Sequence, residues 1–179
     1  MMRTLKYRNG RCRPWLWPVR FLNHFTNPIP AGIWLVNFFF QRVLDINNHV
    51  PWMVNFTSRV VGNIRIGRNV WISFAISGGC YIQGWNGIEI GDDTIFAPGV
   101  KIISANHSKD DFSCCDAAPP ICIGKRCWIG ANAVILPSVN LGDECIVGAG
   151  SVVKDSFPNN SIIVGVPAKN IAITGGKNC

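Results

Sequence analysis

Acidic residues are absent from the first quarter of this 179-residue chain. Seven of the 17 lysines and arginines precede Asp45, but none of the 10 aspartates and glutamates does, so the formal net charge of +7 belongs to this part. The rest of the chain is neutral, which excludes a nucleic-acid-binding protein built around a basic core. Only 15% of residues are charged and 48% are hydrophobic, which excludes general disorder.

Long apolar runs are also missing. The longest, Ile33–Phe40, is interrupted by Asn37, whereas a helix that crosses a bilayer needs about 20 apolar residues. The basic N-terminus continues into Pro14 and Trp15 and not into an apolar stretch with a small-residue cleavage site, so no secretory signal is predicted. The eight cysteines occur in a chain large enough to build a core, unlike small disulfide scaffolds. We therefore expect a cytoplasmic protein with reduced thiols.

Aliphatic and small residues recur every six positions from Val54 onward. A short strand with a tight corner every six residues explains this period, which neither a helix nor a long half-buried strand has. The two runs are Val54, Val60, Ile66, Ile72, Gly78, Gly84, Ile90, Phe96 and Ile102, then Ile123, Ile129, Ile135, Leu141, Val147 and Val153. The period predicts a solenoid of parallel β-coils. An ordinary sandwich is the alternative, although its strands do not hold one register for so long.

Three stretches resemble the hexapeptide-repeat acyltransferases: Ile-Gly-Ala-Asn-Ala-Val (129–134), Val-Gly-Ala-Gly-Ser-Val (147–152) and the closing Gly-Val-Pro-Ala-Lys (165–169). The resemblance is strongest to O-acetyltransferases of sugars and polysaccharides. It implies an all-β, left-handed parallel β-helix of about five coils, with three strands and about 18 residues per coil, in a homotrimer. The expected organisation is an N-terminal extension or cap (1–53), the β-helix (54–171) with an extruded loop (108–122), and a C-terminal tail (172–179).

With this repeat, residues 18 apart lie about 4.8 Å from each other in neighbouring coils. The expected pairs are Gly130 with Gly148, Ala131 with Ala149, and Cys127 with Cys145. The cysteines then fill space in the core as small apolar residues.

His107 ends the first run, directly before 15 residues that fit no hexapeptide. A polar excursion of this length from a compact solenoid is more often functional than not. The resemblance implies that His107, pointing out of the coil, is the catalytic residue. A neutral imidazole can take the proton of an attacking hydroxyl and pass it to the leaving thiolate. Its second nitrogen needs a partner, for which a backbone carbonyl and Asp110, Asp111 and Asp116 are the alternatives.

No phosphate-binding glycine motif of the usual nucleotide types is present. The resemblance implies acetyl-CoA as the donor, in contact with Ala131, Ala149, Lys154 and Lys169. The small side chains would leave a groove in which the ligand meets main-chain groups; plain corner geometry is the alternative. Trp128 points outward, toward either the thioester or a subunit interface. No metal is expected, because a zinc site needs several converging ligands and only one histidine lies in the repeats.

Ser77 and Trp85 occupy the positions where relatives hold the acceptor. Both depart from the polar residues of galactoside-modifying relatives, so we expect a different acceptor, with packing as the alternative explanation of Trp85. The interpretation of the whole chain is an enzyme that moves an acetyl group from acetyl-CoA to a hydroxyl of a sugar or polysaccharide precursor. A non-catalytic scaffold for oligomerisation, or an acetyltransferase with a non-sugar acceptor, remains as the alternative.

The extension holds 10 of the 19 aromatic residues, and a short helix is expected over Ile33–Leu44. It is interpreted either as a cap over the open end of the solenoid or as a surface that docks on an anionic membrane, placing the protein at the inner face.

Overall fold

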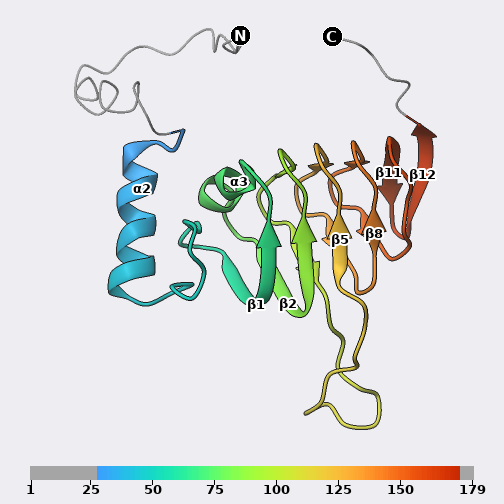
Figure 1. The fold of residues 1–179 in the computed structure, drawn as a ribbon, viewed down its shortest axis with the longest axis horizontal. Helices are drawn as coiled ribbons and strands as arrows, with labels where there is room; N and C mark the ends of the chain where they lie inside the picture. The colour runs from blue at the N-terminus through green and yellow to red at the C-terminus, as the bar shows by residue number, and fades with distance from the viewer. Residues whose placement is uncertain (1–27, 174–179) are drawn as a thin grey trace, which may run out of the picture.

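The chain winds into three parallel ladders of short strands, which form the three faces of a solenoid (Figure 1). The structure is a computed structural model and describes residues 28–173. The first face pairs, in order, the beginning of β1 (Arg59–Ile66), the beginning of β2 (Tyr81–Ile90), β4 (Lys101–Ile103), β7 (Val134–Ile135) and β10 (Val152–Val153).

The second face continues from the first because β1 and β2 turn a corner and pair again with their last residues. The end of β2 pairs with β5 (Ile121–Ile123), which pairs with β8 (Asn140–Leu141). An isolated bridge from Leu141 to Phe157 adds one more rung.

The third face consists of β3 (Ile95–Phe96), β6 (Trp128–Ile129), β9 (Ile146–Val147) and β11 (Ser161–Gly165), all parallel. An antiparallel partner, β12 (Ala168–Ile173), covers the far side of β11. The chain therefore returns to each face once per coil, as the six-residue period predicts.

One row of aliphatic side chains shows how the core is built. Val60, Ile82, Ile102, Ile135 and Val153 are consecutive register partners on the first face, and each is 0% exposed. Full burial of one such side chain stabilises a fold by about 1.5–3 kcal/mol. Each coil can bury its own row only against the next coil, so the solenoid folds as a stack.

The predicted repeat length holds in the second half of the chain. Ile135 and Val153, which are register partners, lie 18 positions apart. Ile90 and Ile123 are 33 positions apart, which is the 18-residue repeat lengthened by the 15 residues of the extruded loop. The 15 extra residues account for the longer spacing, although the last two, Ile121 and Cys122, belong to β5 and pair with β2.

The first coil differs from the prediction. Val60 and Ile82 are 22 positions apart, and Ile72, predicted in a strand, lies in helix α3 (Val70–Ile76). The helix covers the end of the third face: the Phe74 ring packs edge-on against Phe96, 4.9 Å between centroids. The N–H of Phe96 donates to the Ser73 hydroxyl at 3.2 Å. The helix thereby provides a hydrogen-bond acceptor and an apolar partner for β3, which has no further strand beside it.

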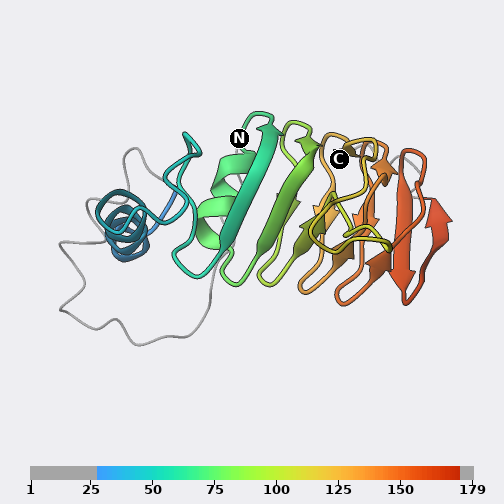
Figure 2. The same cartoon turned by 90° about the horizontal axis from the view of Figure 1, so that it is seen from below.

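The predicted N-terminal helix is present. It consists of α2 (Ala31–Phe38), continued by the π-helical turn η2 (Phe39–Val43), and it stands at the end of the solenoid next to α3 (Figure 2). Within residues 28–173, no helix is long and apolar enough to cross a membrane. The remaining parts of the predicted extension and tail, 1–27 and 174–179, lie outside the described residues.

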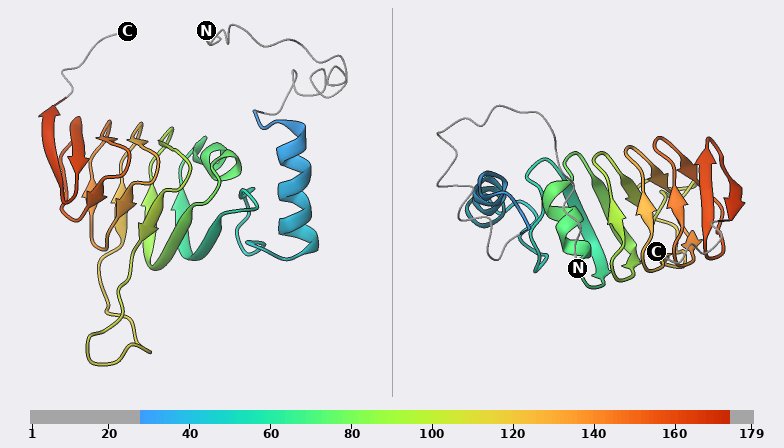
Figure 3. Two further views of the ribbon diagram at one scale, coloured as in Figure 1. Left: turned by 180° about the vertical axis from the view of Figure 1, so that it is seen from behind. Right: turned by 90° about the horizontal axis from the view of Figure 1, so that it is seen from above.

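The extruded loop leaves the solenoid between β4 and β5 and projects away from it (Figure 3). Its two stems are joined by main-chain hydrogen bonds from Ser108 N to Cys114 O, 2.9 Å, and from Asp116 N to Asn106 O, 3.0 Å. The loop base is therefore tied on both sides of His107.

Candidate functional site

His107 lies at the base of the extruded loop, at the corner between the first and second faces. It follows β4 and forms an isolated antiparallel bridge with Cys115 on the returning stem. Its side chain is exposed, as predicted. The main chain of His107 is thus held in place, while its imidazole is accessible from outside the solenoid.

Trp85 is the nearest aromatic neighbour of this imidazole. The two ring centroids are 6.3 Å apart and the ring planes stand at 87°, an edge-to-face arrangement. Trp85 belongs to β2, one coil earlier, and is half exposed. Two residues predicted for different parts of the site, the acceptor position and the histidine, therefore lie side by side.

Gln83 is a buried polar residue of the site that the sequence interpretation missed. Its Nε2 donates to Ala105 O at 3.3 Å, and its Oε1 accepts from Ala105 N at 3.0 Å. The buried amide of Gln83 thus holds both the N–H and the C=O of Ala105, two positions before His107. The signal in the sequence was a glutamine directly after the inward-facing Ile82 of the strand repeat.

Asn86 was missed as well. Its main-chain N–H donates to Ser104 Oγ at 3.0 Å, and its Nδ2 donates to Ser104 O at 3.0 Å and to Asp116 O at 2.9 Å. Ser104 lies on the outgoing stem of the loop and Asp116 on the returning stem. One side chain therefore connects both stems to β2.

The three loop carboxylates proposed as alternatives for orienting the imidazole do not take that position in this structure. Asp111 instead accepts hydrogen bonds from the hydroxyl and N–H of Ser113, at 2.7 and 2.8 Å, and from the Cys114 thiol at 3.4 Å. These bonds, with the Ser113 hydroxyl first, lower the pKa of Asp111. Among the described residues, no hydrogen bond joins His107 to Asp110, Asp111 or Asp116.

Ala131 and Ala149 lie next to each other in successive coils, as predicted. Gly150 N donates to Ala131 O at 2.8 Å, and Gly130 N donates to Val147 O at 2.8 Å. Both alanines follow strands of the third face and precede strands of the first face. They therefore lie at the corner between the third and first faces, which is not the corner that carries His107.

The two lysines occupy other places. Lys154 follows β10 on the first face, so it lies along the same corner as His107, and its ammonium pairs with Asp155 at 2.9 Å. Lys169 lies exposed on β12, opposite Val164. One chain thus does not bring the histidine and all four predicted donor residues together.

Ser77 is placed differently from the prediction. Its side chain is only 3% exposed, and its hydroxyl donates to Phe96 O at 2.7 Å. A buried hydroxyl that already bonds a main-chain carbonyl of the next coil is not available to an acceptor. Ser77 is buried at the C-terminal end of α3, so this structure does not present it to an acceptor as expected. Trp85 remains exposed.

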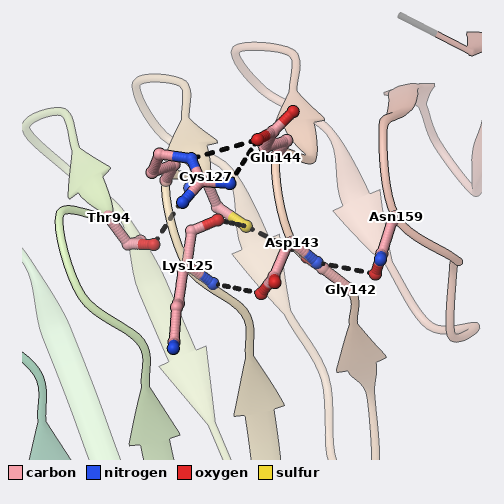
Figure 4. Close-up of polar contacts among 8 residues, drawn as sticks. Thr94, Lys125, Cys127, Gly142, Asp143, Glu144 and Asn159 are labelled. Atoms are coloured by element: carbon pink, nitrogen blue, oxygen red, sulfur yellow. Dashed lines mark hydrogen bonds and ion pairs between the residues drawn. The ribbon is translucent and has the colours of Figure 1, made fainter. Parts of the chain in front are cut away.

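The corner between the second and third faces is a structural ladder (Figure 4). Lys125 N donates to Asp143 Oδ1 at 2.7 Å, and Asp143 N donates to Asn159 Oδ1 at 2.9 Å, so each rung caps the one before it. Cys127 and Cys145 are 1% and 0% exposed, as predicted for core residues. The neighbouring Cys145 thiol and burial both raise the pKa of Cys127.

A groove of about 550 Å³ runs along the second face beside this ladder. Its outward side chains include Arg65, Glu89, Cys122 and Asn140, which are register partners, and Arg65 pairs with Glu89 at 3.3 Å. None of the predicted site residues lines it. The groove is therefore separate from the site around His107.

Comparison with known proteins supports the repeat. A family model described as the hexapeptide repeat of succinyl-transferase matches residues 120–154. A candidate acetyltransferase of Dictyostelium discoideum is 44% identical over 112 residues, which are 61% of this chain and 57% of that protein. The chain thus spans little more than half the length of the curated relatives that it matches.

Solved structures agree with the fold. A maltose O-acetyltransferase of Clostridium difficile is 31% identical, with a TM-score of 0.53 over 66% of this chain and 67% of that one. A hexapeptide-repeat acetyltransferase of Vibrio cholerae, solved with acetyl coenzyme A, is 28% identical, with a TM-score of 0.57 over 66% and 64%. These likenesses imply that the parallel β-helix is left-handed. With the stacked six-residue repeat and its closing motif, they show that the chain belongs to the hexapeptide-repeat acyltransferase family.

Proposed function

We propose that the protein transfers an acetyl group from acetyl-CoA to a hydroxyl of a sugar or polysaccharide precursor, with His107 as the general base. The observation that carries the proposal is the exposed imidazole held beside Trp85 at the base of the extruded loop. The likeness to a maltose O-acetyltransferase and to an acetyltransferase solved with acetyl coenzyme A supports the choice of acceptor and donor.

His107 supplies the proton transfers that the reaction needs. One ring nitrogen accepts the hydroxyl proton as the acceptor oxygen forms its bond to the thioester carbon. The tetrahedral intermediate then collapses, the carbon–sulfur bond breaks, and the imidazolium returns the proton to the departing thiolate. Gln83 and Asn86 act through the main chain, because they hold the peptide before His107 and the loop stems in place.

The donor is proposed to lie in a groove formed by two copies of the chain. Ala131 and Ala149 would contact its pantetheine arm through main-chain groups that small side chains leave accessible. Lys154, and Lys169 at the end of the stack, would meet its phosphates. Because His107 and the alanine pair occupy different corners, a second copy has to bring its alanine corner to the first copy's histidine. A homotrimer closes such head-to-tail contacts into a ring.

The acceptor is proposed to bind against Trp85. An aromatic face next to a polar group suits a sugar ring, whose C–H groups stack while its hydroxyls point to hydrogen-bonding partners. Trp85 is half exposed and touches His107, so a ring stacked on it places a hydroxyl near the imidazole. Ser77 is left out of this site because it is buried.

The test measures coenzyme A release and acetylated product together. The purified protein is incubated with isotopically labelled acetyl-CoA and a panel of sugars, nucleotide sugars, glycans and serine, and products are read by mass spectrometry. We expect label in a sugar-containing acceptor and its loss in His107→Ala, while His49→Ala, which removes an exposed histidine outside the repeats, keeps full activity. Near-normal turnover by His107→Ala refutes the base, and label in serine alone refutes the sugar acceptor.

A further inference from the structure

The N-terminal helix buries its polar side and exposes its apolar side. Of residues 31–43, all of which the structure describes, only Asn37 and Gln41 are buried, at 0% and 4% exposure. They are one turn apart and so share a side of the helix. In water-soluble proteins a helix at the edge of a core normally buries its apolar stripe and exposes its polar one. Here the polar side, with Asn37 and Gln41, faces the solenoid.

The two amides explain why the polar side faces inward. Asn37 Nδ2 donates to Ala75 O at 2.9 Å and its Oδ1 accepts from Phe56 N at 3.0 Å. Gln41 Nε2 donates to Trp52 O at 2.8 Å. These bonds satisfy main-chain groups at the open end of the solenoid, which buried backbone requires. The two buried amides thereby fix the orientation of the helix, and the packing of Phe40 against Phe56, 5.1 Å between ring centroids, supports it.

The outward side of α2 and η2 is almost entirely apolar. Leu35 and Val43 are each 61% exposed, and the same side carries large aromatic residues. In Figures 1 and 2 no described helix or strand lies beyond α2 at this end of the solenoid. We call it the apolar side; it consists of Leu35, Val36, Phe38, Phe39 and Val43. A contiguous exposed patch of this kind marks an interaction surface.

Charge and length decide between the possible partners. The first 44 residues carry seven basic residues and no acidic one, and Arg42 is exposed on the helix itself. Two copies of so positive a segment repel each other, whereas an anionic membrane attracts each one. The helical stretch 31–43 is about 20 Å long at 1.5 Å per residue, too short for a hydrocarbon core of about 30 Å. Such a helix lies in the plane of the interface.

We propose that α2 and η2 dock the protein on the surface of an anionic phospholipid bilayer. The apolar side enters the boundary between headgroups and acyl chains, and Arg42 meets the headgroups. The amide side stays bonded to the first coil, so the solenoid stands on the membrane with its coils leading away from it. The proposal does not depend on the reaction that His107 carries out.

The test is co-sedimentation of the full chain with vesicles of phosphatidylcholine, with and without phosphatidylglycerol, at low and high salt. We expect binding to the anionic vesicles that weakens with salt. Leu35→Glu/Val43→Glu should weaken it about tenfold or more, because two large apolar groups are lost from the interface. Ile95→Glu is the matched control. Ile95 is 53% exposed on β3, outside α2 and η2, so this variant should bind the vesicles as the wild type does.

Two further measurements keep the outcomes distinct. Thermal unfolding checks that the variants fold, and Leu35→Ser/Val43→Ser repeats the test with smaller polar groups. Wild-type binding by both double variants overturns the proposal, because the basic residues before α2 would then suffice. Absence of binding to anionic vesicles also overturns it. A change of oligomer size in the double variants, seen by sedimentation velocity without any vesicle binding, assigns the apolar side to a second copy instead.

Discussion

Gly130 and Ala149 lie so close in successive coils that a Cβ atom on residue 130 would come within 2.6 Å of the main-chain nitrogen of Ala149. Neighbouring coils meet through their main chains at this corner, and only a residue without a side chain fits between them. The corner where the donor is proposed to bind is therefore built from direct main-chain contact.

Gly130→Ala should destabilise the protein by about 1–3 kcal/mol, since the added methyl group forces two coils apart. The measurement is thermal or urea unfolding. Gly32→Ala is the control: Gly32 has no atom within 4 Å of an added Cβ and lies in α2, so this change should be neutral or slightly stabilising. Equal stability of the two variants would contradict the close contact.

Gln83→Leu should remove both bonds to Ala105 while leaving a side chain of similar size. We expect kcat to fall about 10- to 100-fold, because a displacement near 1 Å at the imidazole is costly, while KM for acetyl-CoA stays unchanged. Gln83→Glu keeps an acceptor for Ala105 N and should recover part of the loss. If folded Gln83→Leu retains the wild-type kcat, Gln83 does not position His107.

Asn86→Ala should release the loop without unfolding the solenoid. Its Nδ2 joins the two loop stems, so its loss should speed hydrogen exchange and proteolysis between residues 106 and 118, with little change in the coils. Asn140→Ala is a suitable control because Asn140 is an exposed asparagine of β8, outside the loop. Unchanged protection of the loop would show that the main-chain bonds of the stems suffice.

A mixture of two inactive variants tests whether the site is shared. His107→Ala lacks the base, and Ala149→Trp should block the donor groove at the other corner. In trimers formed from an equal mixture, about one quarter of the sites between copies receive an intact His107 from one chain and an intact Ala149 from its neighbour. We expect about that fraction of wild-type activity. A mixture as inactive as its components would place the whole site in one chain.

The prediction of the coils succeeded where the repeat is regular. From Ile123 to Val153 the inward residues could be placed because hydrophobic period is a property of neighbouring residues. The first coil was not predicted correctly, because its length departs from the 18-residue repeat. The helix α3, which contains Ile72, takes the place of a strand there and is held by the contact of Phe74 with Phe96. Ser77, which the resemblance had put in the acceptor site, is buried at the end of this helix.

The prediction of the site was partial for a similar reason. His107 and Trp85 could be singled out from motif positions, but their contact could not, because they are 22 positions apart in coils of unequal length. Gln83 and Asn86 look like irregular polar insertions until their partners are known. The donor positions Ala131 and Ala149 were placed correctly relative to each other, and their separation from His107 became visible only with the corners assigned.

The amino-acid sequence by itself determined that the chain stacks short strands, which residues point inward from Ile123 to Val153, and where the loop leaves the stack, since these follow from a local alternation of large, small and glycine residues. Tertiary structure decided which corner each functional residue occupies and which side of α2 faces the solvent. Those outcomes depend on hydrogen bonds and packing between residues in different coils, such as Asn37 with Ala75, and no local pattern encodes the partner of a buried amide.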